Sequence, residues 1–283
     1  MTEFVTLESA IGKHLRDGYC AAFEGFTHLI PHAAAHEAIR QGRKDLTLVR
    51  MTPDVIYDQM IGMGLARKLV FSFAGNPGVG LLRRLRDAVE QQWPHAIEIE
   101  EHSHAAMANA YEAGAAGLPC AVFRGYIGAE LKRVNPSIKA VTCPFTGEEL
   151  AAVPAIKPDV GIIHAQKANR RGDVLVEGIV GAQKEVVLAS QRAVVTVEEV
   201  VETFDDVHPN ACILPNWVVD AVAVVPGGAH PSYVHGYYKR DNGAYLAWDP
   251  IAADRDLFLK WMEDHVLNAT AEDFAERVGS LRA

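Results

Sequence analysis

The sequence predicts an α/β fold, with an open, mostly parallel sheet, helices on both of its faces and a helical C-terminal tail. Short apolar runs alternate with amphipathic stretches through the first half of the chain. This order is typical of repeated β-loop-α units, which place parallel strands in one sheet. A chain of 283 residues fits one large domain. We therefore expect a single domain over 1–283, with a helical extension over about 250–283.

The expected elements of the first half follow from periodicity and from residues typical of helix ends. Leu7, Ile11 and Leu15 recur at helical spacing. Pro31 opens a later helix, and Ser103 has the position of a helix N-cap. The expected helices are 6–16, 31–39, 54–63, 79–91 and 103–116. The expected strands are 19–23, 46–49, 68–73, 96–99 and 120–123.

The second half of the chain is less regular. Residues 141–153 predict a hairpin around Thr146-Gly147, and 125–137 is the best candidate for a long loop. Runs of Val and Ile indicate further buried strands. These strands are expected at 160–164, 174–176, 194–197 and 218–225. Two helices are expected to end the chain, over about 250–267 and 271–281.

Charge and composition exclude several classes of protein. The 27 Lys and Arg residues against 36 Asp and Glu give a formal charge of −9, which argues against a nucleic-acid or anionic-membrane binder. No uninterrupted apolar segment is long enough to span a membrane, and the early Glu3 is unlike a signal peptide. The four cysteines form no CxxC pair, so we expect reduced thiols in a soluble cytoplasmic protein.

Polar loops follow the expected strands, and they indicate where a ligand binds. In open parallel sheets, ligands sit beyond the carboxyl ends of the strands. Loops that contain Gly allow close approach of the backbone, and free N–H groups there can bind an anion. The loops in question are 24–28, 51–54, 74–78, 100–104 and 165–169. They predict a site at one edge of the sheet without naming its reaction.

Three familiar site types are disfavoured by the motifs. The loops contain neither GxGxxG nor GxxxxGK[ST], which argues against a dinucleotide or a nucleoside triphosphate. His102 and His104 flank the expected N-cap Ser103, so their rings should diverge, and we expect no metal. A serine hydrolase is disfavoured because the chain lacks GxSxG.

Two further segments allow both a functional and a structural interpretation. Lys167, Arg170 and Arg171 form a positive cluster that could meet the phosphates of a long cofactor or could be a solvated turn. The Gly- and His-rich loop over 227–232 could clamp an interface or bind a ligand directly.

Segments along most of the chain resemble one family. They are 24–42, 115–119, 163–172 and 227–242, of which Ile163-His-Ala-Gln-Lys-Ala168 and Gly227-Gly-Ala-His-Pro-Ser232 are the most specific. In this order they resemble the A subunits of class I CoA-transferases of the glutaconate CoA-transferase type. Segments 24–31, 46–54, 75–79 and 98–104 are similar to A subunits of this family that act on 3-oxoadipate.

This resemblance implies an enzyme made of A and B subunits. Such an enzyme moves CoA from succinyl-CoA to a 3-oxo dicarboxylic acid, here 3-oxoadipate, in aromatic-compound degradation. The nucleophile is a glutamate of the B subunit, which forms a glutamyl-CoA thioester. No catalytic nucleophile, permanently bound cofactor or metal is therefore expected in this chain, and coenzyme A thioester is a substrate. Glu24 stands where the family more often has Gly.

The resemblance also implies roles for loop residues of this chain. An anionic tetrahedral intermediate needs hydrogen-bond donors aimed at its oxygen. The expected donors are the Asn76 side chain first, and then the backbone N–H groups of Gly25, Phe26 and Gly78. Residues expected to bind the acid are Thr27, His28, His102 and Ser103. Residues expected to serve CoA or the subunit interface are Gln166, Lys167, Asn169 and His230.

Other functions stay open on the sequence alone. The chain could belong to a transferase specific for glutaconate or another dicarboxylate, or to a CoA-thioester hydrolase on the same fold. A non-catalytic module that stabilises a partner is a further alternative. A single methylene of the acceptor changes binding by only about 1–3 kcal/mol, so the acid cannot be read from the loops.

Overall fold

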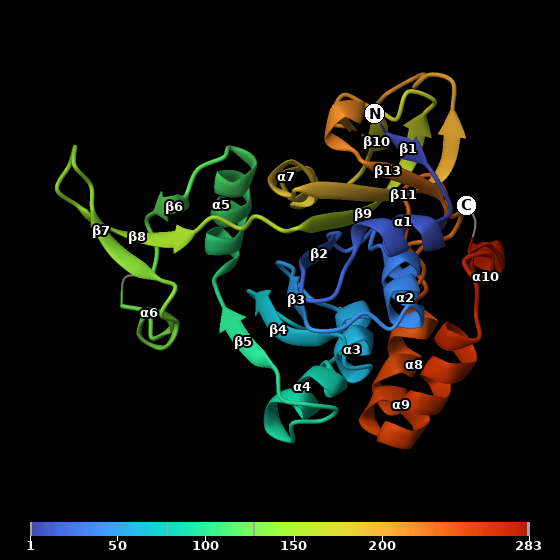
Figure 1. Cartoon of the computed structure of the whole chain (residues 1–283), viewed down its shortest axis with the longest axis horizontal. Coiled ribbons are helices and arrows are strands. Elements are labelled where there is room, and N and C mark those ends of the chain that lie inside the picture. Colours follow the sequence, from blue (N-terminus) through green and yellow to red (C-terminus); the bar gives the residue numbers. More distant parts are fainter. Residues whose placement is uncertain (1, 78, 127, 282–283) are drawn as a thin grey trace.

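A large sheet forms the centre of the computed structural model, which describes residues 2–77, 79–126 and 128–281 (Figure 1). All neighbours on its main path are parallel, which confirms the predicted fold class. In order across the sheet, the strands are β1 (Glu3–Phe4), β13 (Ala221–Val224), β11 (Arg192–Val201), β9 (Val160–Asn169), β2 (Cys20–Glu24), β3 (Leu46–Val49), β4 (Ala66–Phe71) and β5 (Glu98–Glu101). The short β10 (Val174–Val176) pairs antiparallel with β9 and with β12 (Cys212–Leu214).

Helices cover both faces of this sheet, because side chains on successive strand residues point to opposite faces and both sets are apolar. Phe23 and Leu48 belong to the larger core on one face, and Ala22 and Val49 belong to the smaller core on the other. The larger core is covered by α1 (Leu7–His14), α2 (His32–Arg40), α3 (Val55–Gly62), α4 (Arg83–Glu90), α8 (Asn242–Ala253) and α9 (Arg255–Met262). The smaller core is covered by α5 (His104–Ala115) and α7 (Gln183–Ala189).

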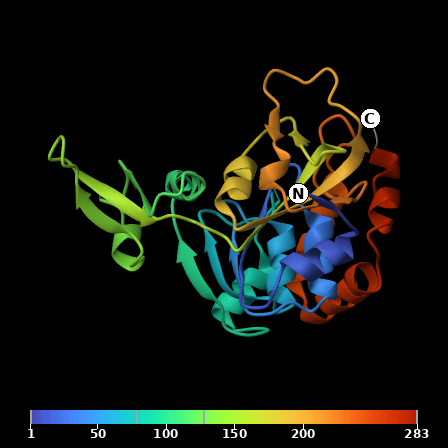
Figure 2. The same cartoon turned by 45° about the horizontal axis from the view of Figure 1, so that its top comes forward.

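A second, antiparallel sheet stands out from the body (Figures 1 and 2). Its strands are β6 (Cys120–Phe123), β8 (Glu149–Pro154) and β7 (Lys139–Thr142), and β7 and β8 form the predicted hairpin. The expectation that 120–123 joins the parallel sheet is wrong. Strand β6 instead pairs with β8, and Ala121 packs against Ala110 of α5 and its neighbours. The expected long loop contains the short helix α6 (Leu131–Val134).

The C-terminal helices start earlier than the sequence suggested. Helix α8 begins at Asn242, because Asp241 caps it by accepting a hydrogen bond from the Ala244 N–H at 2.9 Å. Pro250 lies inside α8 and lacks the N–H for one helical hydrogen bond, but the helix continues past it. The tail then runs through α9, a π-helix (Glu263–Leu267) and α10 (Asp273–Arg277). Within the described ranges, no helix is both long and apolar enough to cross a bilayer.

Candidate functional site

The loop after β2, residues 25–31, occupies the middle of the sheet edge where the parallel strands end. Strand β2 lies between β9 and β3, so loops from both sides flank this one. The Leu29 N–H donates to the Tyr233 carbonyl at 3.1 Å, and the Ile30 N–H donates to the Ser232 hydroxyl at 3.2 Å. Two distant parts of the chain therefore hold this loop in one conformation.

Gly25 is fixed at the start of this loop by close contacts. A Cβ atom at this position would lie 2.6 Å from the Leu29 carbonyl oxygen and 2.8 Å from the Ile30 Cα atom. Its N–H donates to the Glu24 carboxylate at 3.2 Å, and its carbonyl accepts from Arg50 at 2.7 Å. Glycine is required because the backbone folds back on itself too closely for any side chain.

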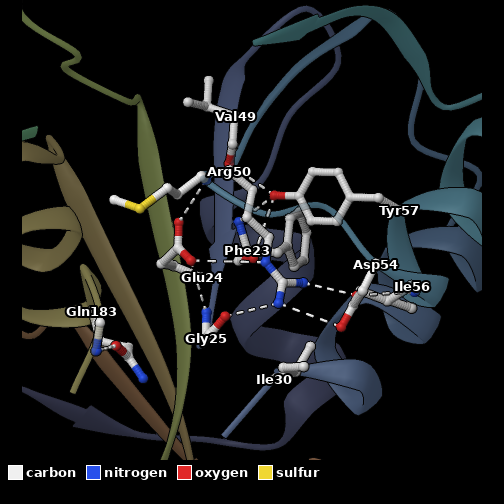
Figure 3. A network of polar contacts seen from close by, with 12 residues as sticks. Phe23, Glu24, Gly25, Ile30, Val49, Arg50, Asp54, Ile56, Tyr57 and Gln183 are labelled. Carbon is white, nitrogen blue, oxygen red and sulfur yellow. Dashed lines mark hydrogen bonds and ion pairs between the residues drawn. The ribbon is translucent and has the colours of Figure 1, made fainter. Parts of the chain in front are cut away.

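The Gly25 contacts belong to a buried group of charges that we call the Arg50 cluster, made of Glu24, Arg50 and Asp54 (Figure 3). All three side chains are at most 2% exposed. Arg50 Nη1 lies 2.9 Å from Asp54 Oδ1, and Arg50 Nε lies 3.7 Å from Glu24 Oε1. Asp54 also caps α3 by accepting from the Ile56 N–H at 3.3 Å. The cluster thus connects β2, β3 and α3.

The three groups shift one another's pKa values. Burial raises the pKa of Glu24 and of Asp54, and the Arg50 guanidinium opposes both rises. Burial by itself disfavours the charged guanidinium, but Asp54 and Glu24 outweigh it and raise the pKa of Arg50. Arg50 is therefore a permanent positive charge directly beneath the loop after β2.

Two tyrosines tie the Arg50 cluster to the helices on each face. Tyr111 of α5 donates to Glu24 Oε2 at 3.4 Å, from the face covered by α5 and α7. Tyr57 of α3 lies under the guanidinium, 5.5 Å from ring centroid to Arg50 Cζ, and donates to the Val49 carbonyl at 2.8 Å. Both rings are fully buried. The Arg50 cluster beneath the loop after β2 is therefore held by helices on both faces of the sheet.

The predicted acid-binding residues of the loop after β2 divide into an exposed and a buried part. Thr27 is exposed, and Phe26 is half-buried against the segment around Gly181. His28 is fully buried, stacked on Tyr233 with centroids 4.8 Å apart. Its Nε2 lies 2.6 Å from the Ile179 carbonyl, and burial lowers its pKa. Thr27 thus offers its hydroxyl at the surface, whereas His28 supports the loop from below.

Asn76 lies in the loop after β4 and is 2% exposed. Its Nδ2 donates to the Tyr245 carbonyl at 2.8 Å, and its Oδ1 has no partner among the described residues. No hydrogen bond in the described part of the chain joins this amide to the loop after β2. The other candidate donor of this loop, Gly78, falls outside the described residues.

His102 and Ser103 stand at the end of β5, three strands from β2, or about 14 Å across the sheet. His102 is 5% exposed, and its Nε2 lies 2.9 Å from Glu100 Oε1. The Ser103 hydroxyl caps α5, as the sequence predicts, by accepting from the Ala106 N–H at 3.1 Å. These two residues therefore lie apart from the Arg50 cluster.

The residues predicted to serve CoA or the interface differ in how free they are. Gln166 is fully buried and makes two hydrogen bonds to the Glu177 backbone, at 2.9 and 3.0 Å. Asn169 holds the turn into β10 by accepting from the Arg171 N–H and donating to Asp173. Lys167 is partly exposed, 3.4 Å from Glu199. Lys167 alone of these three could reach an outside ligand without breaking an internal hydrogen bond.

The other two cations of the predicted positive cluster are both paired at the surface. Arg170 Nε lies 2.5 Å from Glu202, and Arg171 lies 3.1 Å from Asp173. This segment therefore presents balanced charges and not a free basic patch.

His230 sits in the loop after β13 and belongs to a second set of buried contacts. Its Nε2 lies 2.9 Å from Asp241 Oδ2, and burial lowers its pKa. Nearby, Glu198 accepts hydrogen bonds from the Tyr238 hydroxyl and the Gly227 N–H, and it lies 2.8 Å from His164 Nε2. The sequence did not single out Glu198, although a glutamate inside a Val-rich strand was a signal.

Three carboxylates at this edge are already engaged. Glu24, Glu100 and Glu198 each make hydrogen bonds within the chain. Among the described residues, no group of three or more His, Cys, Asp or Glu could hold a metal ion. The geometry holds the peptide groups of Gly25 in a fixed orientation, and preoriented backbone N–H groups suit stabilisation of an anion.

Known proteins resemble this chain over nearly its full length. It is 60% identical over 278 residues to the A chain of the 3-oxoadipate CoA-transferase of Pseudomonas knackmussii, covering 98% of this chain and 97% of that protein. The crystal structure of glutaconate coenzyme A-transferase from Acidaminococcus fermentans matches with a TM-score of 0.90 and 29% identity, over 100% of this chain and 96% of that one. The cholesterol ring-cleaving hydrolase IpdA subunit of Rhodococcus jostii is 26% identical over 84% of this chain and 82% of that protein.

The family assignment rests on the whole sheet and its loops. Residues 4–224, from β1 to the end of β13, match the family described as Coenzyme A transferase. This confirms the resemblance drawn from the sequence motifs. The chain belongs to the coenzyme A transferase family.

Proposed function

We propose that this chain is the A subunit of a heteromeric transferase that moves CoA from succinyl-CoA to 3-oxoadipate. The observation that carries the proposal is the 60% identity, over 98% of this chain, to a protein named as the A subunit of such an enzyme. The likeness extends to both ends of the chain, so it includes all of the edge loops and the C-terminal helices.

The proposed reaction is an exchange of thioester for carboxylate through a glutamate of the partner subunit. The glutamate attacks the succinyl carbonyl, CoA leaves as a thiolate, and a mixed anhydride forms. The thiolate then attacks the glutamyl carbonyl, which releases succinate and leaves a glutamyl-CoA thioester. The carboxylate of 3-oxoadipate repeats these two steps in the reverse order, so CoA is transferred and the glutamate regenerated. Each attack passes through a tetrahedral oxyanion, which needs donors from the protein.

In this scheme our chain supplies the wall opposite the nucleophile. The Phe26 N–H is its proposed oxyanion donor, because the Gly25 N–H already donates to Glu24. Asn76 is proposed to support the site from the loop after β4 without touching the substrate, because its side chain is 2% exposed and its Nδ2 donates to the Tyr245 carbonyl. Thr27 is proposed to bind the acid, with His102 and Ser103 forming the far wall, and Lys167 is proposed to face CoA or the partner. The burial of Glu24 and the hydrogen bonds that it accepts from Gly25, Met51 and Tyr111 support placing the nucleophile on the other subunit.

The proposal is tested with the complex of this chain and the product of its neighbouring reading frame. The purified complex is mixed with succinyl-CoA and, separately, 3-oxoadipate, glutaconate, adipate or acetoacetate, and acyl-CoA products are measured by mass. We expect transfer to 3-oxoadipate at the highest kcat/KM, and none when either chain is assayed without the other. Release of free CoA without any acceptor acid would instead favour a thioester hydrolase. Absence of transfer to all four acids would contradict the proposal.

A further inference from the structure

The Gly25–Phe26 peptide is held from below by a guanidinium. Arg50 Nη2 donates to the Gly25 carbonyl at 2.7 Å, inside the core and beneath the loop (Figure 3). This peptide is not among the cis bonds of the chain. In a planar trans peptide, the C=O and the following N–H point in opposite directions. The Phe26 N–H therefore points away from Arg50, out of the buried cluster.

The orientation of this peptide is fixed on every side. Glu24 holds the Gly25 N–H at 3.2 Å, and a Cβ at Gly25 would lie only 2.6 Å from the Leu29 carbonyl oxygen. Arg50 itself is anchored by Asp54 at 2.9 Å, and that carboxylate is fixed in turn as the cap of α3. With 1% of its side chain exposed, Arg50 cannot contact a substrate directly. Any effect of Arg50 on the reaction must pass through the Gly25–Phe26 peptide.

A charged donor on the carbonyl also changes the amide electronically. Hydrogen bonds to the two ends of a peptide strengthen each other, because polarising the carbonyl makes the N–H a better donor. Glu24 and Asp54 balance the charge of the guanidinium, so this effect is confined to the peptide that Arg50 contacts directly. The polarised Phe26 N–H is therefore a stronger donor to a negatively charged oxygen.

We propose that Arg50 is a positioning residue for CoA transfer. It orients and polarises the Gly25–Phe26 peptide so that the Phe26 N–H stabilises the oxyanion of each tetrahedral intermediate. This inference rests on the function proposed above and extends it to a residue that touches no substrate. Asp54 and Glu24 act in the same unit, since they keep Arg50 charged and in place.

The first test replaces Arg50 by lysine in the complex with the partner subunit. Lysine keeps the positive charge but loses the planar fork that reaches both Asp54 and the Gly25 carbonyl. We expect kcat to fall about 30- to 100-fold, less than the roughly 100- to 1000-fold loss when an oxyanion donor is removed outright, because the Phe26 N–H itself is kept. We expect the KM values for succinyl-CoA and the acid to change less than about threefold, because donor loss acts on the transition state.

The matched control is Arg84→Lys. Arg84 is also a buried arginine, with 4% of its side chain exposed, and pairs with Asp87 at 3.1 Å. It lies on α4 and stacks over Trp93 and Phe258, away from the loop after β2. Its substitution should lower the midpoint of thermal unfolding and leave kcat within about twofold of wild type.

A charge-balanced variant, Arg50→Gln with Asp54→Asn, guards against misfolding of the single variant. It removes one positive and one negative charge, and asparagine still caps α3. The rate of enzyme–CoA thioester formation is measured in a single turnover for both variants. We expect the double variant to form the enzyme–CoA thioester at least as slowly as Arg50→Lys. Its midpoint of thermal unfolding should be close to that of Arg84→Lys.

These measurements separate the failure of this inference from failure of the proposed function. If the wild-type complex does not transfer CoA, the proposed function is wrong. If it does, and a folded Arg50 variant turns over within about twofold of it, the positioning role is wrong. If both Arg50 variants fail to assemble while Arg84→Lys assembles, Arg50 belongs to the framework of the fold, and the inference is again contradicted.

Discussion

The loop after β2 and the segment after β10 are both held at the sheet by buried polar side chains, but by different chemistry. At the first, the charged Arg50 holds the Gly25 carbonyl and a carboxylate holds the Gly25 N–H. At the second, the neutral Gln166 amide donates to the Glu177 carbonyl at 2.9 Å and accepts from its N–H at 3.0 Å. In each case both the N–H and the carbonyl of one residue are hydrogen-bonded to side chains.

The difference shows what a neutral amide can do and what it cannot. The neutral Gln166 amide satisfies the Glu177 N–H and carbonyl and needs no counter-charge, so it is sufficient for holding this segment. A buried arginine must be surrounded by carboxylates, because removing charges from water is costly unless they are paired. Retaining such a cluster beneath Gly25 is reasonable if it orients and polarises the Gly25–Phe26 peptide, which is the role that we propose for Arg50.

The largest expected effect comes from Gly25→Ala. The added Cβ would lie 2.6 Å from the Leu29 carbonyl oxygen, so the loop must shift and the peptide above Arg50 turns with it. We expect kcat of the complex to fall at least about 100-fold, since a donor misplaced by about 1 Å loses that much. Steady-state kinetics with succinyl-CoA and 3-oxoadipate measures this.

The matched control for that substitution is Gly12→Ala in α1. There the nearest atom to a new Cβ is Gln41 Oε1 at 3.5 Å, an ordinary contact. Alanine in a helix is favoured over glycine by about 0.5–1 kcal/mol, so this variant should be slightly more stable and fully active. Equal kcat values for Gly25→Ala and Gly12→Ala would contradict a catalytic role for the loop after β2.

Glu24→Gln is expected to have the next largest effect. The glutamine side chain has the shape of the glutamate, but its NH2 group replaces one carboxylate oxygen. That NH2 group would face the N–H of Gly25 or of Met51, so two donors would meet where a donor and an acceptor meet now. We expect kcat to fall about tenfold and the free energy of unfolding to fall by about 1–3 kcal/mol. Urea unfolding and kinetics are compared with Glu37→Gln, a buried glutamate of α2. An unchanged kcat would mean that the Arg50 cluster contributes to the stability of the fold and not to catalysis.

Gln166→Leu tests the second contact of the comparison, between Gln166 and the backbone of Glu177. It leaves the Glu177 N–H and carbonyl without their present partners, at about 1–3 kcal/mol for each buried group. We expect a larger effect on the free energy of unfolding than on kcat, the reverse of the order for Arg50→Lys. If kcat of a stably folded Gln166→Leu complex fell as much as that of Arg50→Lys, the Arg50 contact would have no greater role in catalysis than the Gln166 contact.

The smallest expected effect concerns Glu100 at the end of β5. The hydrogen bond from His102, followed by those from Lys68 and Ser137, lowers the pKa of Glu100 to about 2, against the opposing effect of burial. Because the folded pKa is below the unfolded value, the stabilisation is present above about pH 4.5 and is lost as pH falls toward 2. Glu100→Gln should therefore be less stable than wild type by about 1–2 kcal/mol at pH 7.

Urea unfolding at several pH values checks this prediction. The gap between wild type and Glu100→Gln should narrow as pH falls below 4.5. Glu98→Gln is the control, because Glu98 contacts the same Lys68 from a 65% exposed position, where ion pairs contribute less than about 1 kcal/mol. A gap that stays constant from pH 7 to pH 3 would mean that the pKa of Glu100 is not lowered.

The parallel sheet and its site edge could be predicted because their signals are local. Each buried strand is a short apolar run, and the polar Gly-containing loops follow directly, as at Gly25 and Asn76. The pairing of β6 could not be predicted in this way. Its run resembles the parallel strands, and its choice of β8 over the acidic, exposed edge strand β5 depends on contacts between distant residues.

The roles of individual site residues were harder to predict for the same reason. His28 reads as a loop histidine, but Gly178, 150 positions away, leaves room for its ring and so buries it. Arg50 meets the Gly25 carbonyl only because β2 and β3 are neighbours. A signal for it was available, since Arg50 and Asp54 stand four residues apart directly after an apolar strand. Charges in such a position indicate a buried pair worth testing.

The division of labour between the two subunits is the claim on which the proposed chemistry depends most. The complex is incubated with succinyl-CoA, the covalent intermediate is trapped with borohydride, and both chains are digested and mapped by mass spectrometry. We predict that the reduced glutamate lies in the partner chain, and that Glu24, Glu100 and Glu198 of this chain stay unmodified. A trapped acidic residue in this chain would contradict the proposed division.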